Sequence, residues 1–106
     1  MASFWDDVKS AIVDGYVYAA DKAEELTQIG RAKVEILRLN REIARAMSEI
    51  GGTTFELFDE GREDSIAGDE RIRKAVEDIR AARLGIANQQ REIERIRAER
   101  DVRSDR

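Results

Sequence analysis

Residues 29–57 read IGRAKVEILRLNREIARAMSEIGGTTFEL and repeat an apolar residue at every seventh position. The repeated residues are Ile29, Ile36, Ile43, Ile50 and Leu57. A second ladder follows a polar, glycine-containing break and consists of Ile72, Ile79, Ile86 and Ile93. Because seven residues make two turns of a coiled-coil helix, each ladder marks one helical face. Two such helices on either side of a turn predict an all-α fold, a long antiparallel helical hairpin.

The composition agrees with long helices in a single domain. The 106 residues include no Pro, 40% are charged and 42% are hydrophobic. Proline would interrupt a helix, and a charged, apolar mixture with a heptad period is typical of coiled coils. The chain contains no Cys, no signal peptide and no apolar run of about 18 residues that could span a membrane. We therefore expect a soluble, cytoplasmic protein.

The phase of the first ladder continues back to the N-terminus. With Trp5 at position a and Val8 at position d of the heptad abcdefg, the predicted seam follows a and d as far as Leu57. The chain is then a single hairpin domain over residues 1–100. Its predicted parts are a helix over about 4–58, a turn over 59–68, a shorter helix over 69–100 and a frayed tail over 101–106.

Glycines leave alternatives open within the first helix. A break at Gly30 would let the N-terminal part fold back and form a monomeric three-helix bundle. Gly51-Gly52 could end the helix or mark a close helix crossing, and the apolar phase beyond it favours the crossing. Gly61 is the predicted left-handed residue after the helix, and Asp69 or Asp64 can cap the next one.

The unequal helix lengths predict an oligomer. A hairpin turning near residue 64 places Ile50 beside residues 76–79 and Ile36 beside residues 90–93, and its second helix ends near Ile29. The N-terminal apolar residues then lack a partner in their own chain, which is typical of an interaction surface. We expect a homodimer or tetramer that packs hairpins into a bundle. Its predicted interface residues are Phe4, Trp5, Val8, Ile12, Tyr16, Ile29, Ile36, Asn40, Ile43, Ile50, Leu57, Ile79, Ile86 and Ile93.

Two polar residues, Lys33 and Asn40, occupy a positions of the predicted seam. A buried Asn at a commonly fixes the register and the number of helices. The alternative is a polar pore or ligand site inside a bundle. We favour the role in register.

No residue pattern predicts catalysis, a cofactor or a metal site. The chain has no His and no Cys to activate a nucleophile, and no glycine-rich loop follows a strand. Glu35, Glu42, Glu49 and Glu56 form a row with seven-residue spacing, which we interpret as a solvated face paired with arginines. The arginines of the last third alternate with glutamates and have no aromatic neighbours, so nucleic acid is an unfavoured partner.

The N-terminal segment is also compatible with a membrane surface. Its aromatic residues Phe4 and Trp5 precede an amphipathic pattern, as in interfacial helices. Its aspartates would be repelled by anionic lipid, so contact with another protein is the favoured hypothesis.

The opening MASFWDDVK, the segments Ala23–Leu26, Lys33–Ile36 and Ile50-Gly51, and Phe55–Leu57 together resemble a group of small bacterial helical-hairpin proteins of unassigned function. Members often carry a zinc ribbon after the second helix, and this chain has no Cys there. The start is also similar to ESCRT-III-like membrane-stress proteins, whose long downstream helices are missing here. The resemblance implies a bacterial coiled-coil hairpin and transfers no site.

The expected function follows from these patterns. We expect a non-enzymatic, self-associating coiled-coil scaffold or adaptor whose N-terminal aromatic segment docks a partner. The alternatives are a peripheral membrane protein that uses the same segment and a subunit of a filament-like assembly.

Overall fold

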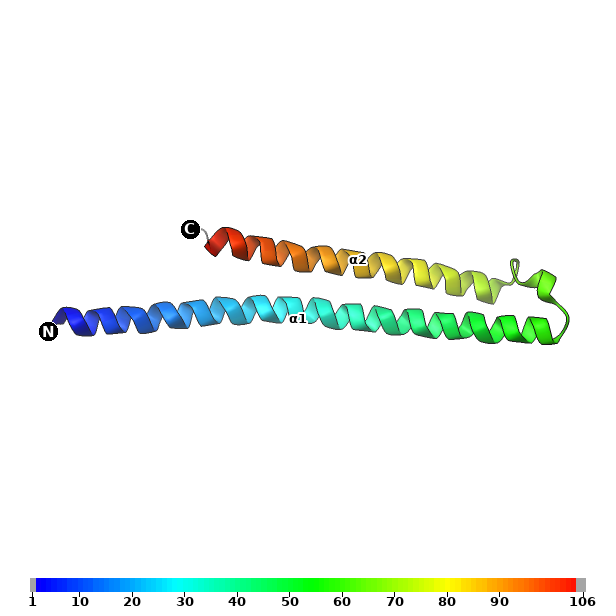
Figure 1. Cartoon of the computed structure of the whole chain (residues 1–106), viewed down its shortest axis with the longest axis horizontal. Helices are drawn as coiled ribbons and strands as arrows, with labels where there is room; N and C mark the ends of the chain where they lie inside the picture. The colour runs from blue at the N-terminus through cyan, green and yellow to red at the C-terminus, as the bar shows by residue number, and fades with distance from the viewer. Residues whose placement is uncertain (1, 105–106) are drawn as a thin grey trace.

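A computed structural model describes residues 2–104 of the chain, with side chains described for residues 23–103. Two long helices, α1 (Ala2–Asp59) and α2 (Glu70–Ser104), are joined by a turn that contains the short 3-10 helix η1 (Glu63–Ser65). They lie side by side and antiparallel in a rod with extents of 90 × 19 × 13 Å (Figure 1). The predicted hairpin with a longer first helix is therefore confirmed.

α1 is one continuous helix through all the glycines that left alternatives open. The break at Gly30 and the three-helix monomer that it would allow are wrong. The close crossing at Gly51-Gly52 is also wrong within this chain, because no heavy atom lies within 4 Å of a Cβ placed on either residue. The apolar residues on both sides of Gly30 and of Gly51-Gly52 pack on α2, and this packing stabilises the helix across the glycines.

The hairpin seam follows positions d and g of α1, not the predicted a and d. The described residues of α1 with less than about a tenth of their surface exposed all occupy position d or g. They are Ile29, Ala32, Leu39, Ala46, Thr53 and Leu57. The predicted seam residues Lys33 and Asn40 at position a are exposed. Desolvating a lysine or an unpaired amide is unfavourable, whereas position g offers apolar or small side chains. The helix therefore turns its g row towards α2.

The predicted seam of α2 matches its buried face. Ile72, Ala75, Ile79, Ala82, Ile93 and Ile96 are buried, and Val76, Ile86 and Gln89 are half-buried. Ile50 packs against the cluster of Ala46, Ala75 and Ile79, and Ile36 packs against the cluster that contains Ile93. The predicted register of the hairpin is confirmed by these two clusters.

The turn uses the predicted helix-ending chemistry. Gly61 has a φ of +69°. Its N–H donates to the carbonyl of Phe58 (3.1 Å), and the N–H of Arg62 donates to the carbonyl of Leu57 (2.7 Å). These two bonds are the Schellman motif, which satisfies carbonyls at a helix end.

Asp69 caps the start of α2, as one of the two predicted candidates. Its Oδ1 accepts hydrogen bonds from the backbone N–H groups of Arg71 (2.9 Å) and Ile72 (3.3 Å). At the other end, α2 continues to Ser104, beyond the predicted end at Arg100. The predicted tail is thus helical as far as Ser104, because alternating Arg and Glu favour a helix and Arg103 suits the negative end of the helix dipole.

The N-terminal part of α1 extends past the end of α2. Near the open end of the hairpin, an ion pair joins the Arg100 Nη1 to the Glu25 Oε1 at 3.4 Å. Counting outward from this pair, Ser104 lies beside about residue 21 of α1 in an antiparallel pair. Figure 1 shows the blue start of α1 extending beyond the red end of α2. We call residues 2–22 the N-terminal overhang.

Candidate interaction surface

The isoleucine ladder is used inside the hairpin. Ile29, Leu57, Ile79 and Ile93 are buried, and Ile36, Ile43, Ile50 and Ile86 are half-buried. Sequence analysis assigned these residues to an interface between chains. Their apolar surface packs within one chain, and their place in an interface between chains stays a prediction.

A second apolar face runs along α1, outside the seam. Among the described side chains of α1, those of residues 23–59, the exposed large hydrophobic residues are Leu26, Val34, Leu37, Met47, Phe55 and Phe58, and all six occupy heptad position a, b or e. These positions are adjacent on a helical wheel, and their centre lies roughly 130° around the helix from the d and g seam. We call these six residues the outer stripe. From Leu26 to Phe58 it spans about 48 Å at 1.5 Å per residue.

The outer stripe is too exposed to be an ordinary scatter of apolar side chains. Val34 is 67% exposed, Phe55 is 70% exposed and Phe58 is 59% exposed. Single exposed hydrophobic residues are common, but several on one face can mark an interaction surface, and here the six are interspersed with polar residues such as Lys33, Asn40 and Arg41. The predicted seam at positions a and d included Leu26 and Met47 of this row, and it left out Val34, Leu37, Phe55 and Phe58. The signal was present as apolar residues at a, b and e of the first helix, in addition to those at d and g.

Basic residues accompany the outer stripe. Between residues 25 and 58, positions a, b, e and f contain no acidic residue. The bases at these positions are Arg31, Lys33, Arg38, Arg41 and Arg45. Position c carries the opposite charge, in a row formed by Glu35, Glu42, Glu49 and Glu56. In residues 25–58, α1 therefore has an apolar face with bases beside it, and the arginines at position f border the glutamates at position c.

Ion pairs hold the acidic row of α1 in place. Arg38 donates to the Glu35 carboxylate at 2.5 and 3.0 Å and to the Glu42 carboxylate at 2.5 Å. The hydrogen bond from Arg38 lowers the pKa of Glu35 below its ordinary value. The predicted pairing of the glutamate row with arginines is confirmed for this residue. These pairs are exposed, so they are expected to contribute little to stability.

The same arrangement recurs on α2. Arg95 donates to the Glu92 carboxylate and, at 2.6 Å, to the Glu99 carboxylate. The hydrogen bond from Arg95 lowers the pKa of Glu92. Both helices thus carry the pattern Glu-x-x-Arg-x-x-x-Glu, in which one arginine pairs with the glutamates on either side of it.

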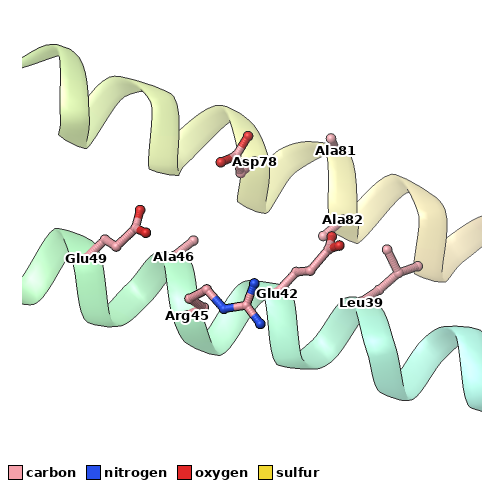
Figure 2. A pocket seen from close by; sticks show the side chains of 8 residues that line it. All are labelled: Leu39, Glu42, Arg45, Ala46, Glu49, Asp78, Ala81 and Ala82. Carbon is pink, nitrogen blue, oxygen red and sulfur yellow. The ribbon is translucent and has the colours of Figure 1, made fainter.

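A shallow groove lies beside the glutamate row of α1, between the two helices. Figure 2 shows Glu42 and Glu49 reaching from α1 towards α2, where Asp78 lines the facing wall. Ala46 and Ala82 are also part of the lining, and the groove is open to solvent. Among the described residues, no three His, Cys, Asp or Glu side chains gather closely enough to hold a metal ion. Arg45 lines the groove as well, so the groove places a guanidinium beside exposed carboxylates and is not an enclosed binding site.

Two ion pairs across the hairpin lie near its two ends. The Arg71 Nη1 lies 3.5 Å from the Glu56 Oε2 near the turn, and Arg100 lies against Glu25 near the open end. Each pair joins a residue of α1 to a residue of α2 in the antiparallel sense. Their positions agree with the register that the apolar clusters set.

Several predicted interface residues remain to be placed. Phe4, Trp5, Val8, Ile12 and Tyr16 lie on the helical overhang, and their side chains are outside the described residues. Asn40 is exposed beside the outer stripe, so it has no role in the hairpin seam. Its role in the register of an assembly stays a prediction. In the described part of the chain, no helix is long and apolar enough to cross a membrane.

Comparisons with protein-family models, with curated proteins and with solved structures found no match to this chain.

Proposed function

We propose that this chain is a non-enzymatic, self-associating coiled-coil scaffold, and that the outer stripe and the N-terminal overhang are its docking surfaces. The observation that carries the proposal is the outer stripe, because six exposed hydrophobic residues share one face of α1. α2 covers a different face of the same helix, so the stripe is free to pack on another helix. A helix with two apolar faces is typical of bundles of three or more helices.

Burial of the stripe provides a driving force for association. Burying a Val, Leu, Phe or Met side chain contributes about 1.5–3 kcal/mol. Several such side chains in one interface can offset the loss of translational and rotational freedom that association requires. The bases beside the stripe restrict the choice of partner to surfaces that are apolar and acidic.

The test is the mass of the full chain in solution, measured by light scattering after size-exclusion chromatography over a range of concentrations. We expect a mass of at least two chains. The double variant Leu37→Glu/Met47→Glu should shift the mass towards that of one chain, because it places charges in the stripe. The matched control is Leu84→Glu, at a residue that is 62% exposed on α2 and lies outside the stripe. A full chain that is monomeric at every concentration would overturn the proposal.

A further inference from the structure

We infer that the hairpin can open at its turn, and that α2 of one chain then packs on the seam of α1 of a second copy in a two-fold dimer. The surface that meets the second copy is the d and g seam of α1, which α2 of the same chain covers in the closed hairpin. The inference goes beyond the proposed function, because it uses the seam and does not use the outer stripe.

The turn contributes little to the packing of the two helices. Among the described residues, the buried side chains lie on α1 and α2, and η1 contains none of them. The ion pairs of Arg71 with Glu56 and of Arg100 with Glu25 also join α1 to α2. Figure 1 shows the green turn at the end of the rod opposite the two termini. A second copy in the same antiparallel register would form the helix contacts again, so the exchange of α2 gives up only the contacts of the turn.

The backbone of the turn needs few changes to become helical. Gly61, with a φ of +69°, is the one described residue that has a positive φ. The segment Glu63–Ser65 is already a 3-10 helix, and Ile66 has the helical angles φ −59° and ψ −51°. The chain has no Pro that would prevent a helix there. Conversion of the turn would therefore join α1 and α2 in one long helix.

In such a continuous helix, the apolar seams of α1 and α2 point in nearly the same direction. The seam residues nearest the turn are Ile50, Thr53 and Leu57 on α1 and Ile72, Ala75 and Ile79 on α2. At about 100° per residue, the mean directions of these two sets differ by about 40°. An apolar helix face is about 100° wide or more, so the two seams overlap. One straight helix can therefore present both seams to an antiparallel second copy.

The register of the hairpin fixes the centre of the open dimer. Residues 64 and 65 lie midway between the paired residues Ile50 and Ile79, and also midway between Ile36 and Ile93. The two-fold axis would pass near them, and the starts of the two α1 helices would lie roughly 190 Å apart at 1.5 Å per residue. The open dimer is then a long spacer with one N-terminal overhang at each end.

Three residues of the turn favour the closed hairpin. In the continuous helix, the seam face between Leu57 and Ile72 would consist of Gly61, Asp64 and Gly68. Each glycine disfavours a helix by about fivefold in the equilibrium constant relative to alanine. The Asp64 carboxylates of the two chains would meet at the two-fold axis, where like charges repel each other. The closed hairpin is therefore the resting form, and a rising protein concentration favours the open dimer.

A cross-link at the open end of the hairpin distinguishes the two forms. Glu25 and Arg100 form an ion pair at 3.4 Å, and the chain has no Cys of its own. In Glu25→Cys/Arg100→Cys, a short bismaleimide joins two positions of one chain if the hairpin is closed. It joins two chains if α2 is exchanged, so a denaturing gel shows the mass of one chain or of two. All variants also carry Leu37→Glu/Met47→Glu, which removes association through the outer stripe.

Replacing the three turn residues should open the hairpin. Gly61→Ala/Asp64→Leu/Gly68→Ala should raise the association constant of the open dimer by about a hundredfold or more, because it gives the turn a helical seam without charge. Links between two chains should then predominate. The matched control is Gly51→Ala/Gly52→Ala, which replaces two glycines at open positions of α1 and leaves the turn unchanged. Its links should stay within one chain.

The chain with its native turn should exchange α2 as well. Refolding from urea at increasing protein concentration should raise the fraction of links between chains, because a second copy then competes with closure within one chain. The single variants Glu25→Cys and Arg100→Cys, unfolded and refolded together, should give linked pairs of one chain of each kind. The same two variants mixed without unfolding should give few such pairs.

Links that stay within one chain at every concentration in the turn variant would overturn the inference. A two-chain mass in light scattering with links only within chains would overturn it too, since closed hairpins would then associate by another surface. If circular dichroism shows that the turn variant is not helical, the chain with the native turn decides by the same criterion. The proposed function is tested separately, by the mass of the chain with native Leu37 and Met47, so either proposal can fail without the other.

Discussion

The Cδ1 atom of Leu39 lies 2.9 Å from the point that a Cβ atom on Gly85 would occupy. Leu39 is buried at position g of α1, and Gly85 lies beside the seam of α2. The two helices therefore pack closely where a leucine meets a glycine. This contact explains why α2 keeps a glycine in the middle of a helix, where alanine would be about 1 kcal/mol more favourable.

Replacing Gly85 with alanine should stabilise the hairpin less than the same change at an open position of a helix. The new methyl group overlaps only the end of the flexible Leu39 side chain, which has to shift, and this cost offsets part of the gain of about 1 kcal/mol in helix propensity, so Gly85→Ala should be less stable than the Gly52→Ala control. Urea unfolding followed by circular dichroism measures the difference. Gly52→Ala is the matched control, because no heavy atom lies within 4 Å of its added Cβ, and it should raise stability by about 1 kcal/mol. A Gly85→Ala variant as stable as the Gly52→Ala variant would show that Leu39 moves aside freely.

Gly61→Ala should destabilise the turn. Gly61 has a φ of +69°, where a Cβ is disfavoured by about 1–2 kcal/mol. Gly61→Asn should be milder, because Asn tolerates the left-handed conformation. Thermal unfolding of these variants and of Gly68→Ala makes the comparison, since Gly68 has no positive φ and open space around its Cβ position. Equal effects of alanine at positions 61 and 68 would contradict the role of the Schellman motif.

Acid should loosen the hairpin at the start of α2. The hydrogen bond from the Arg71 side chain, followed by those from the backbone N–H groups of Ile72 and Arg71, lowers the pKa of Asp69 below its ordinary value. A lowered pKa means that the carboxylate contributes stability above the pKa of the unfolded chain, about 3.9. That contribution is lost as the pH falls through the lower pKa of the folded chain. We therefore expect the thermal midpoint of unfolding to decrease as the pH is lowered below about 4.

Asp69→Asn separates the cap from its charge. Asparagine also caps helices well, so the variant should keep most of the stability at pH 7. It should flatten the part of the acid dependence that comes from this residue, while the part from Glu35 and Glu92 remains, because both of these carboxyls also have lowered pKa values. Thermal midpoints from pH 2 to pH 7 give the comparison. An unchanged acid profile would show that Asp69 does not contribute to it.

The hairpin could be predicted because apolar residues recur every seven positions on both sides of a glycine. The pairing of Ile50 with Ile79 and of Ile36 with Ile93 followed from the position of the turn alone. The face of α1 that turns towards α2 was less predictable. Apolar residues occupy a, d, e and g, so the sequence pattern favours several adjacent faces, and the choice depends on which face fits α2.

The small residues decide between these faces. Ala46 at position g packs in one cluster with Ala75 and Ile79 of α2, and the short alanine side chains allow the helices to approach. Position a would have placed Lys33 and Asn40 at the same contact, where neither has a partner. The residues left over by this choice, such as Leu37 and Met47, form the outer stripe. The sequence pattern of α1 alone does not reveal these exposed residues, because they are exposed only where α2 does not cover the helix.

Leu37 and Leu39 are close neighbours on α1, and truncating each should have a different effect. Leu39 is 7% exposed in the seam, so Leu39→Ala should destabilise the hairpin by about 2–5 kcal/mol through lost burial and a cavity. Leu37 is 50% exposed on the outer stripe, so Leu37→Ala should leave the stability of a single chain within about 0.5 kcal/mol. If the stripe binds a second chain, unfolding of the parent protein shifts to higher urea as protein concentration rises, and Leu37→Ala weakens that shift. Urea unfolding at two protein concentrations measures both effects. A Leu37→Ala variant that loses as much stability as Leu39→Ala at the lowest concentration would mean that residue 37 is packed within its own chain.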